Sequence, residues 1–211
     1  MASPQSASDS QKIAGMSSHD RILQAAKHLF ATRGYESTST VAIARAAGTS
    51  ESQLIKHFGS KEGLLEAIFD MGWERMSSMF PALQPIASPA ERLEALLEMM
   101  LSGMERDPEL KELMLLEGRR IRKEGHMVML TGGYLRLVQM ADGMITEMKQ
   151  KGELRDDVEP QALRCALMGM LEAMMRDQIL AQRIGFPAKF KNDELRKIFH
   201  TVLAAFSKKL R

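Results

Sequence analysis

A helical spacing of apolar residues runs through almost the whole chain, and no other feature limits its possible folds as strongly. Apolar residues recur every three or four positions from about residue 18 onward, whereas alternating runs of β-branched residues are nearly absent. Glycine and proline divide this pattern into segments, because proline breaks a helix interior and glycine commonly follows a helix C-terminus. The sequence therefore predicts an all-α protein.

The breaks between segments define about nine expected helices, and no internal repeat is evident. Ser17 or Ser18 can cap the first helix, and Gly34 ends it. Asn192 or Asp193 can cap the last. We expect helices over about residues 18–33, 40–46, 51–57, 60–80, 89–106, 108–123, 126–150, 160–183 and 193–208.

The first 17 residues differ in composition from the rest of the chain. They are rich in serine and poor in large apolar residues, which predicts a disordered tail over residues 1–17. This tail lacks the basic start and apolar core of a signal peptide, and no apolar run approaches the roughly 20 residues that span a bilayer. The single cysteine excludes an intramolecular disulfide framework. We therefore expect a cytoplasmic protein without a membrane segment.

The positive charge of the chain lies in its N-terminal third. The formal net charge is +2, from 29 basic and 27 acidic residues. Residues 1–63 hold seven of the basic and five of the acidic side chains, so residues 64–211 are balanced. A modestly basic module joined to a neutral body is compatible with nucleic-acid binding by the module.

Residues 38–65 have the spacing of a helix-turn-helix. Gly48 permits a tight corner between two short helices, and Leu54 and Phe58 lie four positions apart on the second helix. A recognition helix needs such apolar anchors on one side and hydrogen-bonding side chains on the other. The alternative is a helical hairpin with a solvated polar face. The polar residues between the anchors are Ser52, Gln53, Lys56 and His57.

Four spaced blocks of this region resemble the N-terminal domain of the tetracycline-repressor (TetR) family of transcription regulators. The blocks are ILQAAKHLF, RGYESTS, IARAAGTS and LIKHFGSKEGLL, within about residues 18–68. The later GELRDDVEPQAL resembles the segment that leads into the penultimate helix of that family. The resemblance implies a three-helix DNA-binding domain over residues 18–64 and a larger helical ligand-binding and dimerisation domain over residues 65–211.

The resemblance also implies which residues contact DNA. Ser50 caps the recognition helix, whose N–H groups can bind phosphate. Ser52, Gln53 and Lys56 occupy the groove-facing positions, where Gln53 can pair with adenine and Lys56 with guanine. His57 is placed nearer the DNA backbone.

Three further positions match family residues that flank the recognition helix. Thr38 and Ser39 begin the first helix of the motif, where a phosphate contact and a helix cap are implied. Lys61 resembles a phosphate-contacting lysine of the family, and its alternative role is a solvated lysine at a helix start.

Three residues of the motif depart from the family pattern. Ile55 stands where a tyrosine is common, so it can contact a thymine methyl but donates no hydrogen bond. Glu51 stands where a small or basic residue is common, and its carboxylate would repel phosphate. Val41 replaces a polar or basic residue. These departures affect the expected phosphate affinity more than the fold.

Methionine is concentrated in the body of the chain, where 16 of the 18 lie from Met71 onward. Flexible thioether side chains suit a pocket for an apolar ligand, although at each single position ordinary core packing is the favoured explanation. With the resemblance, we expect a small, largely apolar effector enclosed by the middle helices. The methionines expected on inner faces are Met99, Met100, Met104, Met114, Met140, Met144, Met168, Met170, Met174 and Met175.

The resemblance further implies a homodimer through the last two helices. Small residues there allow close helix approach, and two recognition helices about one DNA turn apart would bind a palindromic operator in double-stranded DNA. The small or apolar residues are Ala162, Cys165, Ala166, Gly169, Ala173, Leu203 and Ala204.

Other chemistry has little support in the sequence. Cys165 is expected in the core and has no histidine at a motif-like distance. The five histidines share no metal-ligand spacing, so neither a metal nor a cofactor is expected. The run Arg119, Arg120, Arg122 and Lys123 is expected to be a solvated helix end, with additional phosphate contact as the alternative.

Three functions remain in competition at this stage. The leading one is a ligand-responsive dimeric transcription regulator, most simply a repressor. The second is a DNA-binding dimer that organises DNA or blocks a partner without regulating transcription. An enzyme is not expected, because no paired carboxylates, no nucleophile with its base and no metal spacing are evident.

Overall fold

The computed structural model describes residues 16–118 and 130–208. These residues form nine α-helices and one short 3-10 helix, and they contain no strand, only an isolated bridge between Leu154 and Ser207. The all-α prediction is therefore confirmed. The helices are α2 (Ser18–Arg33), α3 (Thr40–Ala46), α4 (Glu51–Phe58), α5 (Lys61–Ser77), η1 (Phe80–Leu83), α6 (Pro89–Arg106), α7 (Pro108–Leu116), α8 (Gly132–Gln150), α9 (Pro160–Ile184) and α10 (Asn192–Phe206).

Serine side chains start most of the N-terminal helices. Each accepts a hydrogen bond from the backbone N–H three residues later, which satisfies a group that the helix itself leaves unpaired. This geometry explains why helices as short as α3 and α4 begin where they do. The capping serines are Ser17, Ser39, Ser50, Ser60 and Ser88.

Several boundaries differ from the expected ones for local reasons. The helix expected over residues 60–80 ends at Ser77, and the 3-10 helix around Pro81 follows it. Helix α8 begins at Gly132, where the Thr131 hydroxyl accepts a hydrogen bond from the Tyr134 N–H, and residues 126–129 of the expected helix lie outside the described residues. The expected Asn192 or Asp193 cap of α10 is wrong, since the Glu194 carboxylate accepts from the backbone N–H of Lys191.

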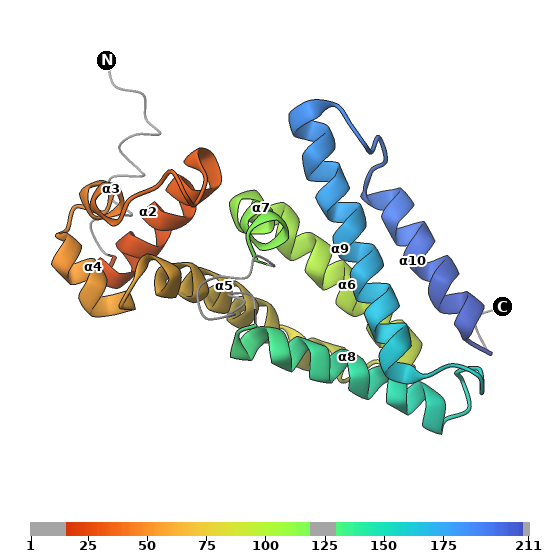
Figure 1. The fold of residues 1–211 in the computed structure, drawn as a ribbon. Helices are drawn as coiled ribbons and strands as arrows, with labels where there is room; N and C mark the ends of the chain where they lie inside the picture. Colours follow the sequence, from red (N-terminus) through yellow and green to blue (C-terminus); the bar gives the residue numbers. More distant parts are fainter. Residues whose placement is uncertain (1–15, 119–129, 209–211) are drawn as a thin grey trace, which may run out of the picture.

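The helices are arranged as a small bundle joined to a larger one (Figure 1). Helices α2, α3 and α4 lie at one end, and α5 runs from them into the body, where it packs against α8 and α7. Helices α6, α8 and α9 form the centre, and α9 and α10 lie side by side far from α4. The predicted domain boundary between residues 64 and 65 falls inside α5, and one continuous apolar core extends to both sides of it.

Some expectations lie outside the described residues. These are the tail, apart from its last two residues, and the basic run of residues 119–123.

Candidate DNA-binding surface and ligand cavity

Apolar anchors hold the recognition helix α4 against its neighbours. Leu54 is fully buried, and Phe58 packs on the same core. The corner before α4 is tight, with Gly48 at φ +62° and the Thr49 N–H donating to the Ala44 carbonyl. A positive φ of this size favours glycine, so the expected reason for Gly48 is confirmed.

The outer side of α4 is open to solvent. Ser52, Gln53 and Lys56 are all exposed, and the Ser52 hydroxyl lies 2.9 Å from that of the capping Ser50. The structure therefore brings together four of the predicted DNA-contacting residues on one accessible surface.

His57 lies at the edge of this surface and contacts α2. Its Nε2 is 3.2 Å from the Ser18 hydroxyl, and its ring meets that of His19 edge-on. These contacts give His57 a part in positioning α4 against α2.

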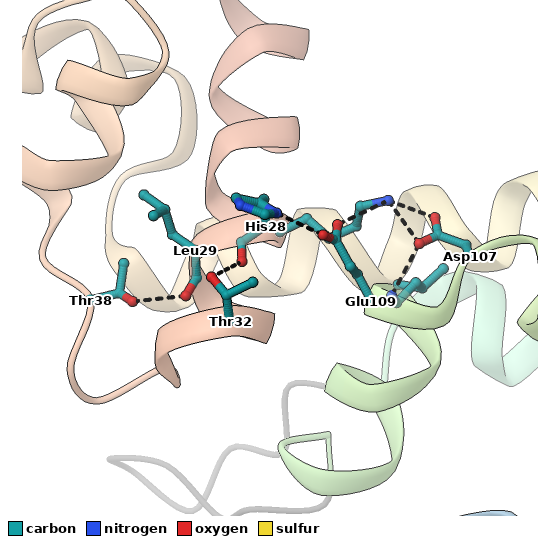
Figure 2. A network of polar contacts seen from close by, with 8 residues as sticks. His28, Leu29, Thr32, Thr38, Asp107 and Glu109 are labelled. Carbon is teal, nitrogen blue, oxygen red and sulfur yellow. Dashed lines mark hydrogen bonds and ion pairs between the residues drawn. The ribbon is translucent and has the colours of Figure 1, made fainter. Parts of the chain in front are cut away.

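Thr38 is not available for the phosphate contact predicted for it. Only 2% of Thr38 is exposed, and its hydroxyl donates to the backbone carbonyl of Leu29 (Figure 2) and to that of Gly34. The hydroxyl thus ties the link after α2 to the end of that helix. Ser39, by contrast, is exposed and caps α3 as expected.

The Lys61 ammonium group is directed to the protein. It donates to the carbonyls of Tyr35 and Thr38 at 2.9 and 3.1 Å, and it lies 4.2 Å from the centre of the Tyr35 ring. Neither of the two roles considered for Lys61 describes this geometry. The lysine joins the start of α5 to the link between α2 and α3.

All three residues that depart from the family pattern lie on the exposed surface. Ile55 is 42% exposed and Val41 is 49% exposed, so both side chains are accessible to a partner. The Glu51 carboxylate accepts a hydrogen bond from the Thr40 hydroxyl, so it joins the first turns of α3 and α4. One oxygen of the Glu51 carboxylate is therefore engaged within the protein.

Arg21 is a structural residue of the motif that the sequence did not single out. Its guanidinium donates to the carbonyl of Ala47 at the corner and to that of Met16 before α2. It therefore fixes the corner relative to α2. The long sequence separation from Ala47 left no local signal of this contact.

A largely apolar hollow of about 140 Å³ lies in the body between α5, α6 and α7. A smaller one of about 40 Å³ shares Trp73, Met100, Met104 and Met114 with it. A third, of about 30 Å³, shares Met100 with both. Larger hollows of about 320 and 250 Å³ occur elsewhere, and charged residues contribute to the walls of both, such as Glu66 and Asp70 in the first and Glu112 and Arg183 in the second.

The methionines that were predicted on inner faces fall into two groups, those outside the three apolar hollows and those on their walls. Met144 is buried core, and Met99, Met140, Met170 and Met174 line none of these three hollows. The other five of the predicted residues form walls, and because thioether chains adapt their shape, their movement can join the hollows. The wall residues are Met100, Met104, Met114, Met168 and Met175.

Three basic residues contribute to the wall of the 140 Å³ hollow, namely Arg75, Arg106 and Lys111. Burial lowers the pKa of Lys111 below its ordinary value of 10.5, which Glu105 partly opposes. A partly desolvated ammonium gains from an anionic partner, so this wall favours a ligand with a negatively charged group.

Asp107 belongs both to the wall of this hollow and to a contact with the DNA-binding domain. Its two carboxylate oxygens accept hydrogen bonds from the Lys27 ammonium at 2.8 and 2.7 Å (Figure 2). Both side chains are less than one-fifth exposed. Next to this pair, the His28 ring nitrogen lies 2.7 Å from the Glu109 carboxylate. We call these four residues the α2–α7 latch.

The exposed sides of α9 and α10 carry small and apolar residues. Ala162, Ala166 and Gly169 are exposed along α9, and Ile198 of α10 is 44% exposed. Cys165 lies on the same side and is exposed, so the expectation that it belongs to the core is wrong. Its neighbours at positions 162 and 169 share its helix face, which explains its exposure.

Within the part of the chain that the structure describes, no helix is long and apolar enough to cross a membrane. Among the same residues, no group of histidine, cysteine, aspartate or glutamate side chains could hold a metal ion.

Two family models match the chain, one for each part of the fold. Residues 22–68 match the model described as bacterial regulatory proteins, tetR family. Residues 73–204 match the model of the YsiA-like protein C-terminal region. The two matches adjoin each other within α5.

Two named relatives share at least a quarter of their residues with this chain over most of its length. The nucleoid occlusion factor SlmA of Vibrio vulnificus is 28% identical over 74% of this chain and 81% of its own length. The HTH-type transcriptional regulator UidR of Escherichia coli is 25% identical over 93% of this chain and 98% of its own.

Solved structures share the fold. The fatty acid degradation regulator FadR of Bacillus halodurans has a TM-score of 0.77 at 22% identity, covering 89% of this chain and 95% of its own. FadR of Bacillus subtilis in complex with stearoyl-CoA has a TM-score of 0.70 at 21% identity, over 87% and 94% of the two chains. AibR in complex with isovaleryl coenzyme A and operator DNA has a TM-score of 0.67 at 22% identity, over 90% and 98%.

Proposed function

The chain belongs to the tetR family of bacterial regulatory proteins and is a ligand-responsive, DNA-binding repressor of transcription; we propose that its effector is an acyl thioester of coenzyme A. The methionine-walled hollows would receive the acyl chain, and the basic wall would meet the anionic coenzyme A portion. Two structural neighbours that are described with acyl-coenzyme A ligands support this assignment.

The observation that carries the response to ligand is the double position of Asp107. The same carboxylate lines the hollow and pairs with Lys27 of the DNA-binding domain. A ligand in the hollow must displace or reshape its wall, so it acts directly on a contact that orients α2. A ligand shifts an equilibrium only through different affinities for the two states, and breaking the α2–α7 latch supplies such a difference.

At the DNA, α4 would enter the major groove with Gln53 and Lys56 contacting base edges. The exposed Ile55 would contact a thymine methyl, in place of the hydrogen bond that it cannot donate. Regulators of this family are usually dimeric, and the exposed apolar sides of α9 and α10 would join two copies. The two copies of α4 would then bind a palindromic operator.

The test begins with selection of binding sites from the genomic DNA of the source organism. Fluorescence anisotropy then measures the affinity for the selected operator with and without acyl-coenzyme A compounds of increasing chain length. The expected result is a roughly 5- to 150-fold weaker operator complex with at least one acyl thioester. Free coenzyme A is the control and should have no such effect. An operator affinity that no acyl thioester changes would refute the proposed effector class.

The match to the nucleoid occlusion factor SlmA favours a second function, in which the dimer binds sites along the chromosome without regulating transcription. Mapping of bound sites in cells separates the two. Sites near promoters, with transcripts that change on deletion of the gene, support regulation. Sites spread over the chromosome without such changes support the second function.

A further inference from the structure

Trp73 carries a buried hydrogen-bond donor that no described group satisfies. The side chain is only 4% exposed, and its Nε1–H has no hydrogen-bond partner in the described structure. Buried polar groups are nearly always paired, because leaving one unpaired is unfavourable. No acceptor for this hydrogen lies among the described residues, and a bound molecule with an acceptor oxygen would satisfy it.

The surroundings of Trp73 form a place for such an acceptor. Trp73 contributes to the walls of both the 140 Å³ and the 40 Å³ hollows, whose other shared residues are three methionines. Thioether sulfur is only a weak acceptor. Glu172, on the wall of the smaller hollow, does not accept this hydrogen.

The position of the Trp73 side chain is fixed by its packing against α8. Gly133 approaches so closely that an added Cβ would lie 2.3 Å from the Trp73 Cβ. The Tyr134 ring lies 5.5 Å from the Trp73 ring, and the Asp70 carboxylate accepts from the Gly133 N–H. The donor is consequently preorganised, which reduces the entropy lost when it binds.

We propose that the Trp73 Nε1–H donates a hydrogen bond to the acyl carbonyl oxygen of the effector. Trp73 then selects an acyl thioester over an alkyl chain of the same length without a carbonyl. This inference rests on the proposed function, because it assumes that the effector carries an acyl group. Arg75, Arg106 and Lys111 would hold the anionic end of the same molecule.

The chain has a single tryptophan, so the donor can be observed directly. Protein labelled with ¹⁵N in the indole shows one Nε1–H resonance, which is followed during titration with octanoyl-CoA and with S-octyl-CoA, the thioether without a carbonyl. We expect the thioester to move this resonance downfield and slow its solvent exchange, and the thioether to bind without that downfield shift. Equal shifts with both compounds, or thioester binding that leaves the resonance unchanged, would overturn the inference.

A substitution adds an independent measurement by calorimetry. Trp73→Phe retains an aromatic ring but removes the donor, so octanoyl-CoA should bind roughly 5- to 30-fold more weakly while S-octyl-CoA is nearly unaffected. Met100→Leu changes the wall of all three hollows without touching the donor, and it should alter both affinities alike. Equal loss for both compounds in Trp73→Phe contradicts the inference.

If neither compound binds the native protein in calorimetry, the proposed effector class fails, and the inference fails with it. If both bind and only the indole response is missing, the effector class stands and the role of Trp73 is refuted.

Discussion

At the scale of single residues, the DNA-binding surface separates into side chains that face outward and side chains that hold the motif together. Gln53 and Lys56 are exposed on α4 without a described protein partner that would have to be released. Thr38 and Lys61, which resemble phosphate-contacting residues, use their polar groups on backbone carbonyls instead. We therefore expect base preference to depend on Gln53 and Lys56.

Gln53→Ala and Lys56→Ala should each weaken operator binding by about 1–3 kcal/mol. The loss for Gln53 should depend on the identity of one base pair, because a bidentate amide discriminates between bases. Anisotropy titrations against a panel of single-base operator variants measure both effects. His57→Ala is the control, since its ring is held against α2 and its loss should not change base preference. Unaltered affinity and preference in both test variants would contradict the assignment.

Effector binding should weaken at alkaline pH because the pKa of Lys111 is lowered by burial. The sign follows from the charge: only the protonated ammonium attracts an anionic ligand, and a lowered pKa means that this form is lost before an ordinary lysine titrates. Calorimetry with the acyl-CoA over a pH series should show affinity falling as the pH rises through that lowered pKa. Lys111→Met should bind more weakly near neutral pH and flatten the profile, whereas an unchanged slope would rule out this role.

At the scale of elements, the contact between α2 and α7 connects effector and DNA. Asp107 accepts the Leu110 N–H at the start of α7 while it pairs with Lys27 of α2. Movement of α7 is therefore transmitted to the helix on which α3 and α4 rest. The close approach of α8 to α5 at Gly133 fixes the opposite side of the cavity.

Lys27→Met and Asp107→Asn should uncouple the two sites. Asparagine is also a good helix cap, so Asp107→Asn removes the ion pair while α7 can still begin at the same place. In either variant, the ratio of operator affinities without and with effector should fall from roughly 5–150 towards unity. Calorimetry should show that the effector still binds. Retention of the full ratio in both variants would exclude the α2–α7 latch as the route of coupling.

Gly133→Ala should destabilise the protein by about 1–3 kcal/mol, because the new methyl group would overlap the Trp73 Cβ. Gly143→Ala is a matched control on the same helix, where an added Cβ meets nothing within 4 Å. There the substitution should stabilise by about 0.5–1 kcal/mol, since alanine has the higher helix propensity. Thermal unfolding followed by circular dichroism compares the two. Similar shifts in the same direction would argue against tight packing between α5 and α8.

At the scale of the whole molecule, two features of the surface are expected of a chain that forms a dimer. One is the recognition helix, which alone covers a single half-site. The other is the exposed side of α9, which carries small residues, together with the exposed Ile198 of α10. These two helices lie at the end of the body far from α4 (Figure 1). A two-fold axis through that side would bury the exposed side of α9 and would give the dimer two recognition helices for two half-sites.

Ala166→Glu should convert the dimer to a monomer, because it places a charge in the centre of the proposed interface. Light scattering after size exclusion gives the mass, and operator affinity should fall by roughly 100-fold or more when the two half-sites are no longer bound together. Gln139→Glu adds the same charge to an exposed position of α8 and should change neither property. A dimeric Ala166→Glu variant would place the interface elsewhere.

The sequence alone determined the fold class, the order of the helices and the outward residues of α4. These follow from information that lies within a few residues: the period of apolar positions, a serine or glycine at a helix end, and the four-residue spacing of Leu54 and Phe58. Where proline follows closely, as at Pro81 after α5, the helix ended at Ser77, three residues before the expected boundary. The family resemblance supplied the expected roles of the residues but not their partners.

Only the tertiary structure decided which side chains meet across the chain. Lys27 and Asp107 are 80 positions apart, and no local pattern joins them. The same holds for the buried hydroxyl of Thr38, the exposed thiol of Cys165 and the indole N–H of Trp73, which no described group accepts, because burial depends on how the helices pack. A sequence specifies what each helix can present, whereas the packing of helices specifies what each side chain finds opposite it.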